Sequence, residues 1–109
     1  MPIVEDAGRF AAPPDGVTPR YVEHLRTADI SVGTYSIPAG GVDGQSPHTE
    51  DEIYVVTAGR AVFVDAGGRV AVGPGDTLFV AAGAEHRFVE VSEDFAVVVV
   101  FGPAEYSRG

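Results

Sequence analysis

The residues of this chain best suited to chemistry are His48, Glu52 and His86. Neutral imidazoles and a carboxylate are ligands that zinc and the divalent first-row metals accept. The first two residues lie in a glycine-punctuated segment, residues 40–59, and the third lies in a similar segment, residues 75–86. Glycines at such spacing are typical of turns between short elements. We therefore expect the two segments to meet, so that the three side chains can close on one metal ion.

The spacing of His48 and Glu52 allows two local geometries. On a straight strand, residues four apart lie on the same face. Alternatively, residues 49–51 form the turn of a hairpin and the two ligands flank that turn. We favour the hairpin, because the polar triplet is followed by the strongly β-prone run 53–57.

Side-chain alternation predicts which residues surround the site. Tyr54 lies on the same side of its strand as Glu52, and Glu90 lies on the same side as His86. Aromatic candidates for the pocket wall are Tyr35, Tyr54, Phe63, Phe79 and Phe88. Some of these have to be ordinary core residues, because a small barrel fills its interior with side chains.

The elements that must position these residues are short strands separated by turn signals. Apolar alternation or short apolar runs predict strands at residues 21–25, 30–37, 53–57, 61–65, 69–72, 77–80, 86–91 and 95–101. The last of these has no polar face, which predicts a strand buried on both sides. No long amphipathic helix is visible. The pattern predicts an all-β sandwich or barrel.

The length of 109 residues fits one domain. Residues 1–19 are rich in proline, which argues against a helix, so we expect a loose N-terminal arm that either packs or stays mobile. Residues 20–109 then form a single β-barrel domain.

Composition excludes several classes of function. The net charge is −9, and all seven basic residues are scattered arginines, so no basic surface is available for nucleic acid or anionic membranes. The chain has no cysteine, which rules out disulfides and thiolate ligands. The longest apolar run is far shorter than the roughly 20 residues of a membrane helix, and no secretory signal is seen. We therefore expect a cytoplasmic protein.

The spacing in the first segment resembles the first motif of the cupin superfamily, which reads Gly-x5-His-x-His-x3–4-Glu-x6-Gly. Its positions fall on Gly40, Ser46, His48, Glu52 and Gly59. The resemblance implies a jelly-roll barrel of the small single-domain kind, and cupins typically hold their metal with three histidines and a glutamate.

The second segment resembles the second cupin motif, Gly-x5-Pro-x-Gly-x2-His-x3-Asn. Its positions fall on Gly75, Ala81, Gly83, His86 and Glu90. Alanine stands for the family proline and glutamate for the final asparagine. The resemblance covers roughly residues 30–101.

One departure affects the metal, because Ser46 replaces the first family histidine. Carried over, the resemblance leaves three ligands, and serine is a poor ligand for these ions. Gln45, Ser46 or Glu50 is the candidate for a fourth ligand or for a contact behind the ligands. Two histidines and a carboxylate are also the ligand set of non-haem iron oxygenases. The set suits one divalent ion of iron, manganese, zinc, nickel or copper.

These observations leave three functions open. The first is a mononuclear metal enzyme on a small organic molecule, with oxygenation as the most concrete version and isomerase or lyase chemistry also compatible. The second is a metal-free or weakly metal-binding cupin that serves as a small-ligand binding module. The third is a structural or oligomerisation domain, whose pocket would be filled by its own side chains. We also expect a homodimer, because open jelly rolls have edges to cover and because cupins are usually dimeric.

Overall fold

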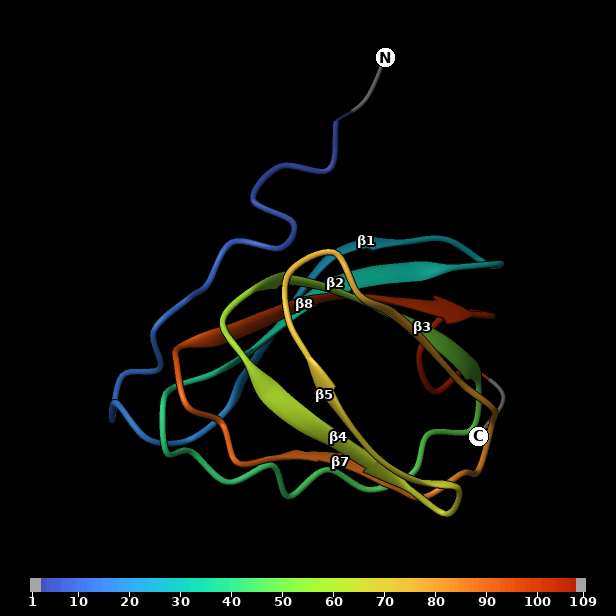
Figure 1. Ribbon diagram of the computed structural model, residues 1–109. Coiled ribbons are helices and arrows are strands. Elements are labelled where there is room, and N and C mark those ends of the chain that lie inside the picture. Colours follow the sequence, from blue (N-terminus) through green and yellow to red (C-terminus); the bar gives the residue numbers. More distant parts are fainter. Residues whose placement is uncertain (1–2, 108–109) are drawn as a thin grey trace.

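Within the described residues, eight antiparallel strands form two sheets that wrap around one apolar core rich in aromatic side chains, so the predicted all-β jelly-roll fold is confirmed (Figure 1). The structure is a computed structural model that describes residues 3–107. The larger sheet has the order β1 (Arg20–Arg26), β2 (Ser31–Ile37), β8 (Phe95–Gly102), β3 (Asp51–Ala58) and β6 (Thr77–Val80). The smaller sheet has the order β5 (Gly68–Val72), β4 (Ala61–Asp65) and β7 (His86–Val89). Within residues 3–107 no helix is long and apolar enough to cross a membrane.

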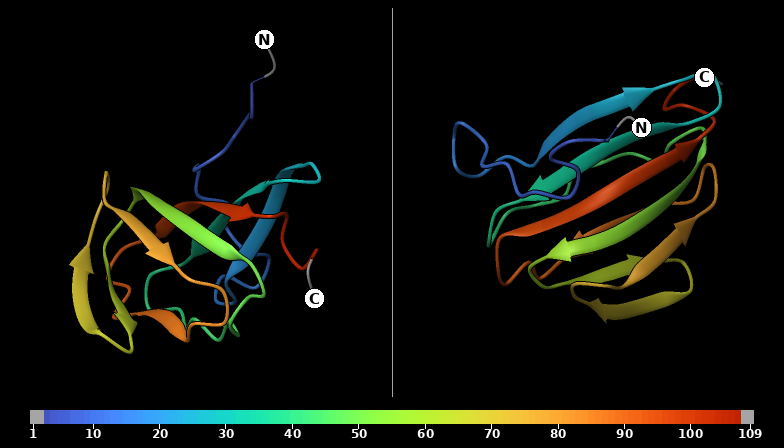
Figure 2. Two further views of the ribbon diagram at one scale, coloured as in Figure 1. Left: turned by 90° about the vertical axis from the view of Figure 1, so that its right-hand side faces the viewer. Right: turned by 90° about the horizontal axis from the view of Figure 1, so that it is seen from above.

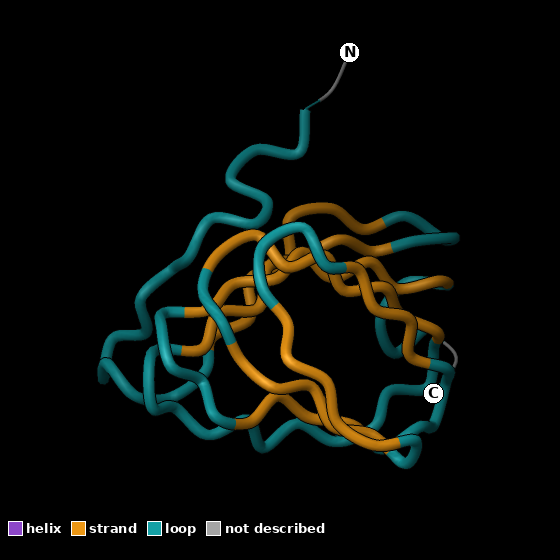
Figure 3. The backbone as a smooth tube through the Cα atoms, in the orientation of Figure 1, coloured by secondary structure: helices purple, strands orange, loops and turns teal. Residues whose placement is uncertain are grey.

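Alternation along the strands directs side chains to the core or to the outside, as the period of a strand requires. On β3, Glu52, Tyr54 and Val56 are buried, whereas Ile53 and Val55 are only half-buried. Loops join the strands at both ends of the barrel (Figure 3).

The central strand β8 differs from its prediction on one face. Its inward residues are fully buried, but the outward residues Val98 and Val100 are half-buried. The prediction that both faces of β8 are buried is therefore wrong for the outward face at Val98 and Val100. The strand lies between β2 and β3 within a sheet, and within the described residues no second sheet covers its outer side.

The N-terminal segment crosses the outer side of the larger sheet (Figure 2). The amide of Gly8 donates a hydrogen bond to Thr34 Oγ1 at 2.8 Å, and its carbonyl accepts one from Thr57 Oγ1 at 2.5 Å. Gly8 has a φ of 82°, and a β-carbon there would lie 2.7 Å from the Thr57 methyl, so the close approach requires glycine. His24 lies on this outer side and hydrogen-bonds Thr34 at 2.7 Å, away from the other two histidines.

The segment after β8 turns back toward the mouth of the barrel. Ala104 is buried, and the amide of Glu105 donates a hydrogen bond to Ser31 Oγ at 2.8 Å. The guanidinium of Arg26 donates to the Glu105 carbonyl at 2.9 Å. These contacts fix the tail so that the Glu105 side chain reaches the interior.

Candidate metal centre

Three elements bring His48, Glu52 and His86 together at one end of the barrel. His48 comes from the loop before β3, Glu52 is the second residue of β3, and His86 is the first residue of β7. One potential ligand atom from each residue lies within 4.8 Å of the other two. Glu52 Oε1 is 2.9 Å from His86 Nε2 and 3.8 Å from His48 Nδ1. Atoms bound to one ion at about 2.1 Å are about 3.0–3.5 Å apart, so the set could hold a metal after small shifts.

The expected hairpin around residues 49–51 is wrong. Asp51 already belongs to β3, Thr49 and Glu50 form a bend, and no strand precedes them in the described loop. His48 is held instead by tertiary contacts, because its carbonyl accepts a hydrogen bond from the amide of Gly83 at 2.8 Å. That bond links the two glycine-rich segments directly.

The metal fits this site because buried polar atoms are otherwise left unsatisfied. Among the described residues, apart from the Tyr21 hydroxyl, the buried side-chain atoms without a hydrogen-bond partner are His48 Nδ1 and both carboxylate oxygens of Glu52. Each such atom costs about 1–3 kcal/mol. The contact of Glu52 with His86 is short but lacks hydrogen-bond alignment. A cation placed between these atoms would satisfy all of them at once.

Hydrogen bonding fixes the tautomer of His86. Its Nδ1 lies 2.8 Å from the carbonyl oxygen of Ala84, which can only accept, so Nδ1 carries the proton. The lone pair of Nε2 is then directed to the site, as in metal-binding histidines held from behind. The Tyr54 hydroxyl lies 2.9 Å from this nitrogen and 3.1 Å from Gln45 Oε1. When its single hydrogen is donated to Gln45, the nitrogen is free for an ion.

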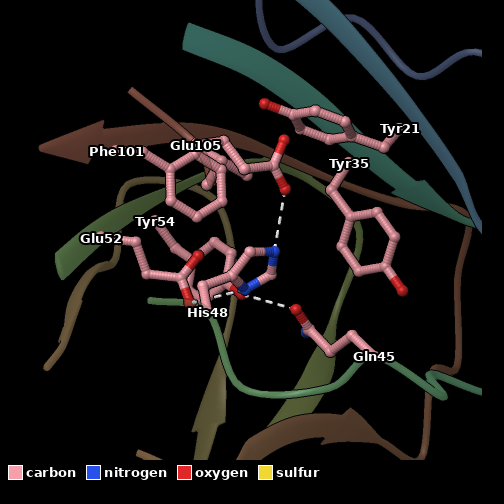
Figure 4. A pocket seen from close by; sticks show the side chains of 9 residues that line it. Tyr21, Tyr35, Gln45, His48, Glu52, Tyr54, Phe101 and Glu105 are labelled. Atoms are coloured by element: carbon pink, nitrogen blue, oxygen red, sulfur yellow. Dashed lines mark hydrogen bonds and ion pairs between the residues drawn. The ribbon is translucent and has the colours of Figure 1, made fainter. Parts of the chain in front are cut away.

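The imidazole of His48 is also held through the nitrogen that faces away from the metal site, in this case by a carboxylate. Glu105 Oε2 lies 2.9 Å from His48 Nε2, and the two side chains are 14% and 10% exposed (Figure 4). A carboxylate on Nε2 keeps the proton there and leaves Nδ1 as the free ligand atom. The His48 ring is also packed against Phe101, with centroids 4.7 Å apart, and stacked on Tyr106 at 5.1 Å.

Burial and charge shift several pKa values at the site. Burial alone lowers the pKa of His86, but the Glu52 carboxylate and the Ala84 carbonyl outweigh it and raise the pKa above its usual value. Burial raises the pKa of Glu105, and the neighbouring His48 offsets only part of this. Burial, then the charge of Glu52, raises the pKa of Tyr54, so its hydroxyl stays protonated.

The candidates for a fourth ligand take different places. Gln45 faces the site, with its amide nitrogen bound to Asp43 Oδ2 at 2.8 Å and its amide oxygen next to Tyr54. Ser46 is exposed and lines the hollow that His86 and Gln45 also line. Glu50 is buried, but it accepts hydrogen bonds from the Thr49 hydroxyl and the Tyr106 amide and is not part of the three-residue group. Gln45 is thus the one of the three that lines the space on both sides of the site, beside His48 and Glu52 and beside His86.

A cavity of about 140 Å³ opens beside His48 and Glu52, whereas His86 lines a separate hollow on the other side (Figure 4). The cavity is lined by Tyr21, Tyr35, Gln45, His48, Glu52, Tyr54, Val99, Phe101 and Glu105. Tyr35 and Tyr54 were expected there. Tyr21 and Glu105 were not, and no local pattern marks them, because they come from the first strand and from the tail after the last.

Four other residues expected at the pocket lie elsewhere. Phe63 and Phe88 are core residues packed on each other, with ring centroids 5.4 Å apart. Phe79 is 62% exposed, because it pairs with Ile53 on the outer face of the sheet. Glu90 follows the end of β7 with a φ of 51°, which breaks the alternation and turns its side chain outward to an ion pair with Arg69.

Comparison with known proteins agrees with this geometry. The cupin domain family matches residues 33–102. An uncharacterized protein of Streptomyces coelicolor is 42% identical over 85 residues, which cover 78% of this chain and 81% of that protein. Two solved structures share the fold. KdgF from Halomonas sp. has a TM-score of 0.68 at 22% identity, covering 76% of this chain and 78% of that chain. A protein of Thermus thermophilus has a TM-score of 0.73 at 19% identity, covering 86% and 90%. The chain therefore belongs to the cupin family.

Proposed function

We propose that the protein is a mononuclear metal enzyme that acts on a small organic molecule. The observation that carries the proposal is the set of buried, unsatisfied atoms on His48 and Glu52 that face the free nitrogen of His86. Each histidine is held from behind, by Glu105 or by the carbonyl of Ala84. A fold stabilised only by its core gains nothing from such an arrangement, whereas a metal site requires it.

The chain's own residues would hold the ion and shape the space beside it. His48, Glu52 and His86 are the ligands, and Gln45 with Tyr54 supplies a polar edge next to them. A bound divalent ion would supply Lewis acidity or, as iron, redox chemistry with oxygen. The aromatic walls of the cavity exclude bulk water and restrict the size of the substrate.

Oxygenation is the first version of this proposal, because two histidines and one carboxylate are the ligand set of non-haem iron oxygenases. Isomerase and lyase chemistry use the same set of residues without oxygen. Oxygen uptake by the iron-loaded protein with a panel of phenols and amino alcohols separates the two. Product formation without oxygen uptake would leave the lyase or isomerase version.

The alternative is a metal-free or weakly metal-binding module for a small ligand. It is favoured by one observation, the exposed Ser46 at the position where the cupin motif has a ligand histidine. This alternative predicts that a ligand occupies the cavity with equal affinity before and after removal of metal.

Elemental analysis of the purified full chain tests the metal proposal. We expect about one divalent ion per chain after loading, and its loss in both His48→Ala and His86→Ala. His24→Ala is the matched control, because it removes the third histidine, which lies on the outer side of the sheet bonded to Thr34. Metal retained by both site variants, or absent from the loaded wild type, would contradict the proposal.

We also propose a homodimer in the cytoplasm. Phe79, Ile53 and Val100 form an apolar row across the outer face of the larger sheet. Phe79 leaves most of its surface open in the single chain. Sedimentation at micromolar concentration should give the mass of two chains, and Phe79→Glu should shift it to one.

A further inference from the structure

Among residues 3–107, no positively charged side chain lines the cavity beside His48 and Glu52. None of its nine lining residues is an arginine, and the chain contains no lysine. The guanidinium of Arg26 is close enough to lower the pKa values of the cavity residues Tyr21 and Glu105. It is already paired with Glu23 at 3.0 Å and with the Glu105 carbonyl at 2.9 Å. The described part of the chain therefore offers no free cationic side chain to an anionic group in the cavity.

Negative charge, by contrast, surrounds the cavity. Glu52 and Glu105 line it, and the buried Asp43 lies directly behind Tyr35 and Gln45, to which it is hydrogen-bonded. A divalent ion held by neutral histidines carries two positive charges against these three carboxylates. The site therefore keeps a negative balance with the metal bound.

Aromatic rings form the remaining walls. Tyr21, Tyr35, Tyr54 and Phe101 border the cavity from different strands (Figure 4). The Tyr35 hydroxyl is held by Asp43 at 2.7 Å, so the ring is fixed in place. The Tyr21 ring packs against Gly33, where a β-carbon would be 2.2 Å from the Tyr21 hydroxyl oxygen. Rings fixed around a carboxylate-lined space are the arrangement that binds organic cations, through the negative faces of the rings.

Electrostatics at the tyrosines agree with this assignment. Burial, and then the charge of Glu105, raises the pKa of Tyr21. Burial, and then the charge of Asp43, raises the pKa of Tyr35. Both hydroxyls therefore stay neutral, and the cavity remains negative only through its carboxylates.

We propose that the cavity accepts a small organic cation, an amine or quaternary ammonium compound, with its positive group between the aromatic rings and Glu105. This rests on the proposed function in that it names the class of molecule brought to the metal centre. The volume of about 140 Å³ limits the molecule to few heavy atoms, since a cavity of about 150 Å³ admits benzene.

Choline and its neutral carbon isostere, 3,3-dimethylbutanol, test the charge preference, because they share shape and hydroxyl group. Binding to the full chain is followed by NMR titration, in zinc-loaded and in metal-free protein. We expect choline to bind about tenfold or more tightly than the isostere in both forms. Equal affinities, tighter binding of the isostere, or binding of neither probe would overturn the proposal.

Variants then assign the preference to the cavity. Glu105→Gln should lower choline affinity about tenfold and leave the isostere nearly unchanged. Tyr21→Leu should weaken choline, whereas Tyr21→Phe keeps the ring and should bind as the wild type does. A choline preference that survives both Glu105→Gln and Tyr21→Leu comes from the general acidity of the surface and would also overturn the proposal.

The metal content of each sample separates this inference from the proposed function. If the protein holds no metal after loading, the proposed metal-enzyme function is contradicted, but the preference for choline can still be measured in the metal-free form. If metal binds as expected and choline shows no preference, the cation proposal alone fails.

Discussion

Glu105 lies outside the region of the family match, yet its contact with His48 predicts a large effect on metal affinity. Its carboxylate keeps the proton on His48 Nε2, so that Nδ1 faces Glu52 at 3.8 Å. Glu105→Ala removes the acceptor and lets the imidazole adopt either tautomer and rotate. Glu105→Gln keeps an acceptor oxygen but removes the charge that increases the basicity of the ring.

The size of the effect follows from the geometry of the pair. Partners behind ligand histidines typically contribute about 10–100-fold in affinity, or about 1.4–2.7 kcal/mol. Because the two side chains are nearly buried, screening by water is limited. We expect about tenfold weaker zinc binding for Glu105→Gln, and a loss nearer to 100-fold for Glu105→Ala.

Competition with a chromophoric chelator measures these affinities directly. Glu93→Gln is the matched control, because it makes the same change at an exposed turn. Nitrogen-15 NMR reports the tautomer of His48, and assignment is simple because the chain has three histidines. Zinc affinities of both Glu105 variants within twofold of wild type would refute the role given to this residue.

Three further perturbations follow from the structure. Asp43 is buried and accepts four hydrogen bonds. Asp43→Ala should therefore lower the free energy of unfolding, measured by urea denaturation, by about 2–4 kcal/mol. A loss below about 1 kcal/mol would contradict this. Gly59 has a φ of 77°, and a β-carbon there would lie 2.2 Å from the Asp94 carbonyl oxygen. Gly59→Ala should therefore lower the free energy of unfolding by about 2–4 kcal/mol. Gly44→Ala should lower it far less, because open space surrounds Gly44. Equal unfolding midpoints for the two variants would be inconsistent with the clash. Because the pKa of His86 is raised above its usual value of 6.5, protons already compete with the metal for this ring at a pH above 6.5. Zinc affinity should therefore fall steadily from pH 8 to pH 6, and affinity independent of pH over that range would argue against His86 as a ligand.

The strands could be predicted from the sequence because their signal is local. All eight predicted runs are strands, since alternation and turn glycines act over a few residues. The errors lie at strand ends. Residue 51 already pairs with β8, and the left-handed conformation of Glu90 ends β7 early. Neither a tertiary pairing nor a single backbone conformation has a local pattern.

The site was only partly predictable for the same reason. Motif spacing indicated His48, Glu52 and His86, which the fold brings within reach of one another. Glu105 is 57 residues from His48 along the chain, and only the path of the tail brings the two together. Phe79 was assigned to the wrong face because the register of β6 on β3, which places it opposite Ile53, depends on long-range pairing.

The most direct measurement is a crystal structure of the manganese- or zinc-loaded protein with anomalous diffraction. One peak is expected about 2.0–2.2 Å from His48 Nδ1, His86 Nε2 and a carboxylate oxygen of Glu52. Coordination of His48 through Nε2, or a peak outside this set of residues, would contradict the account.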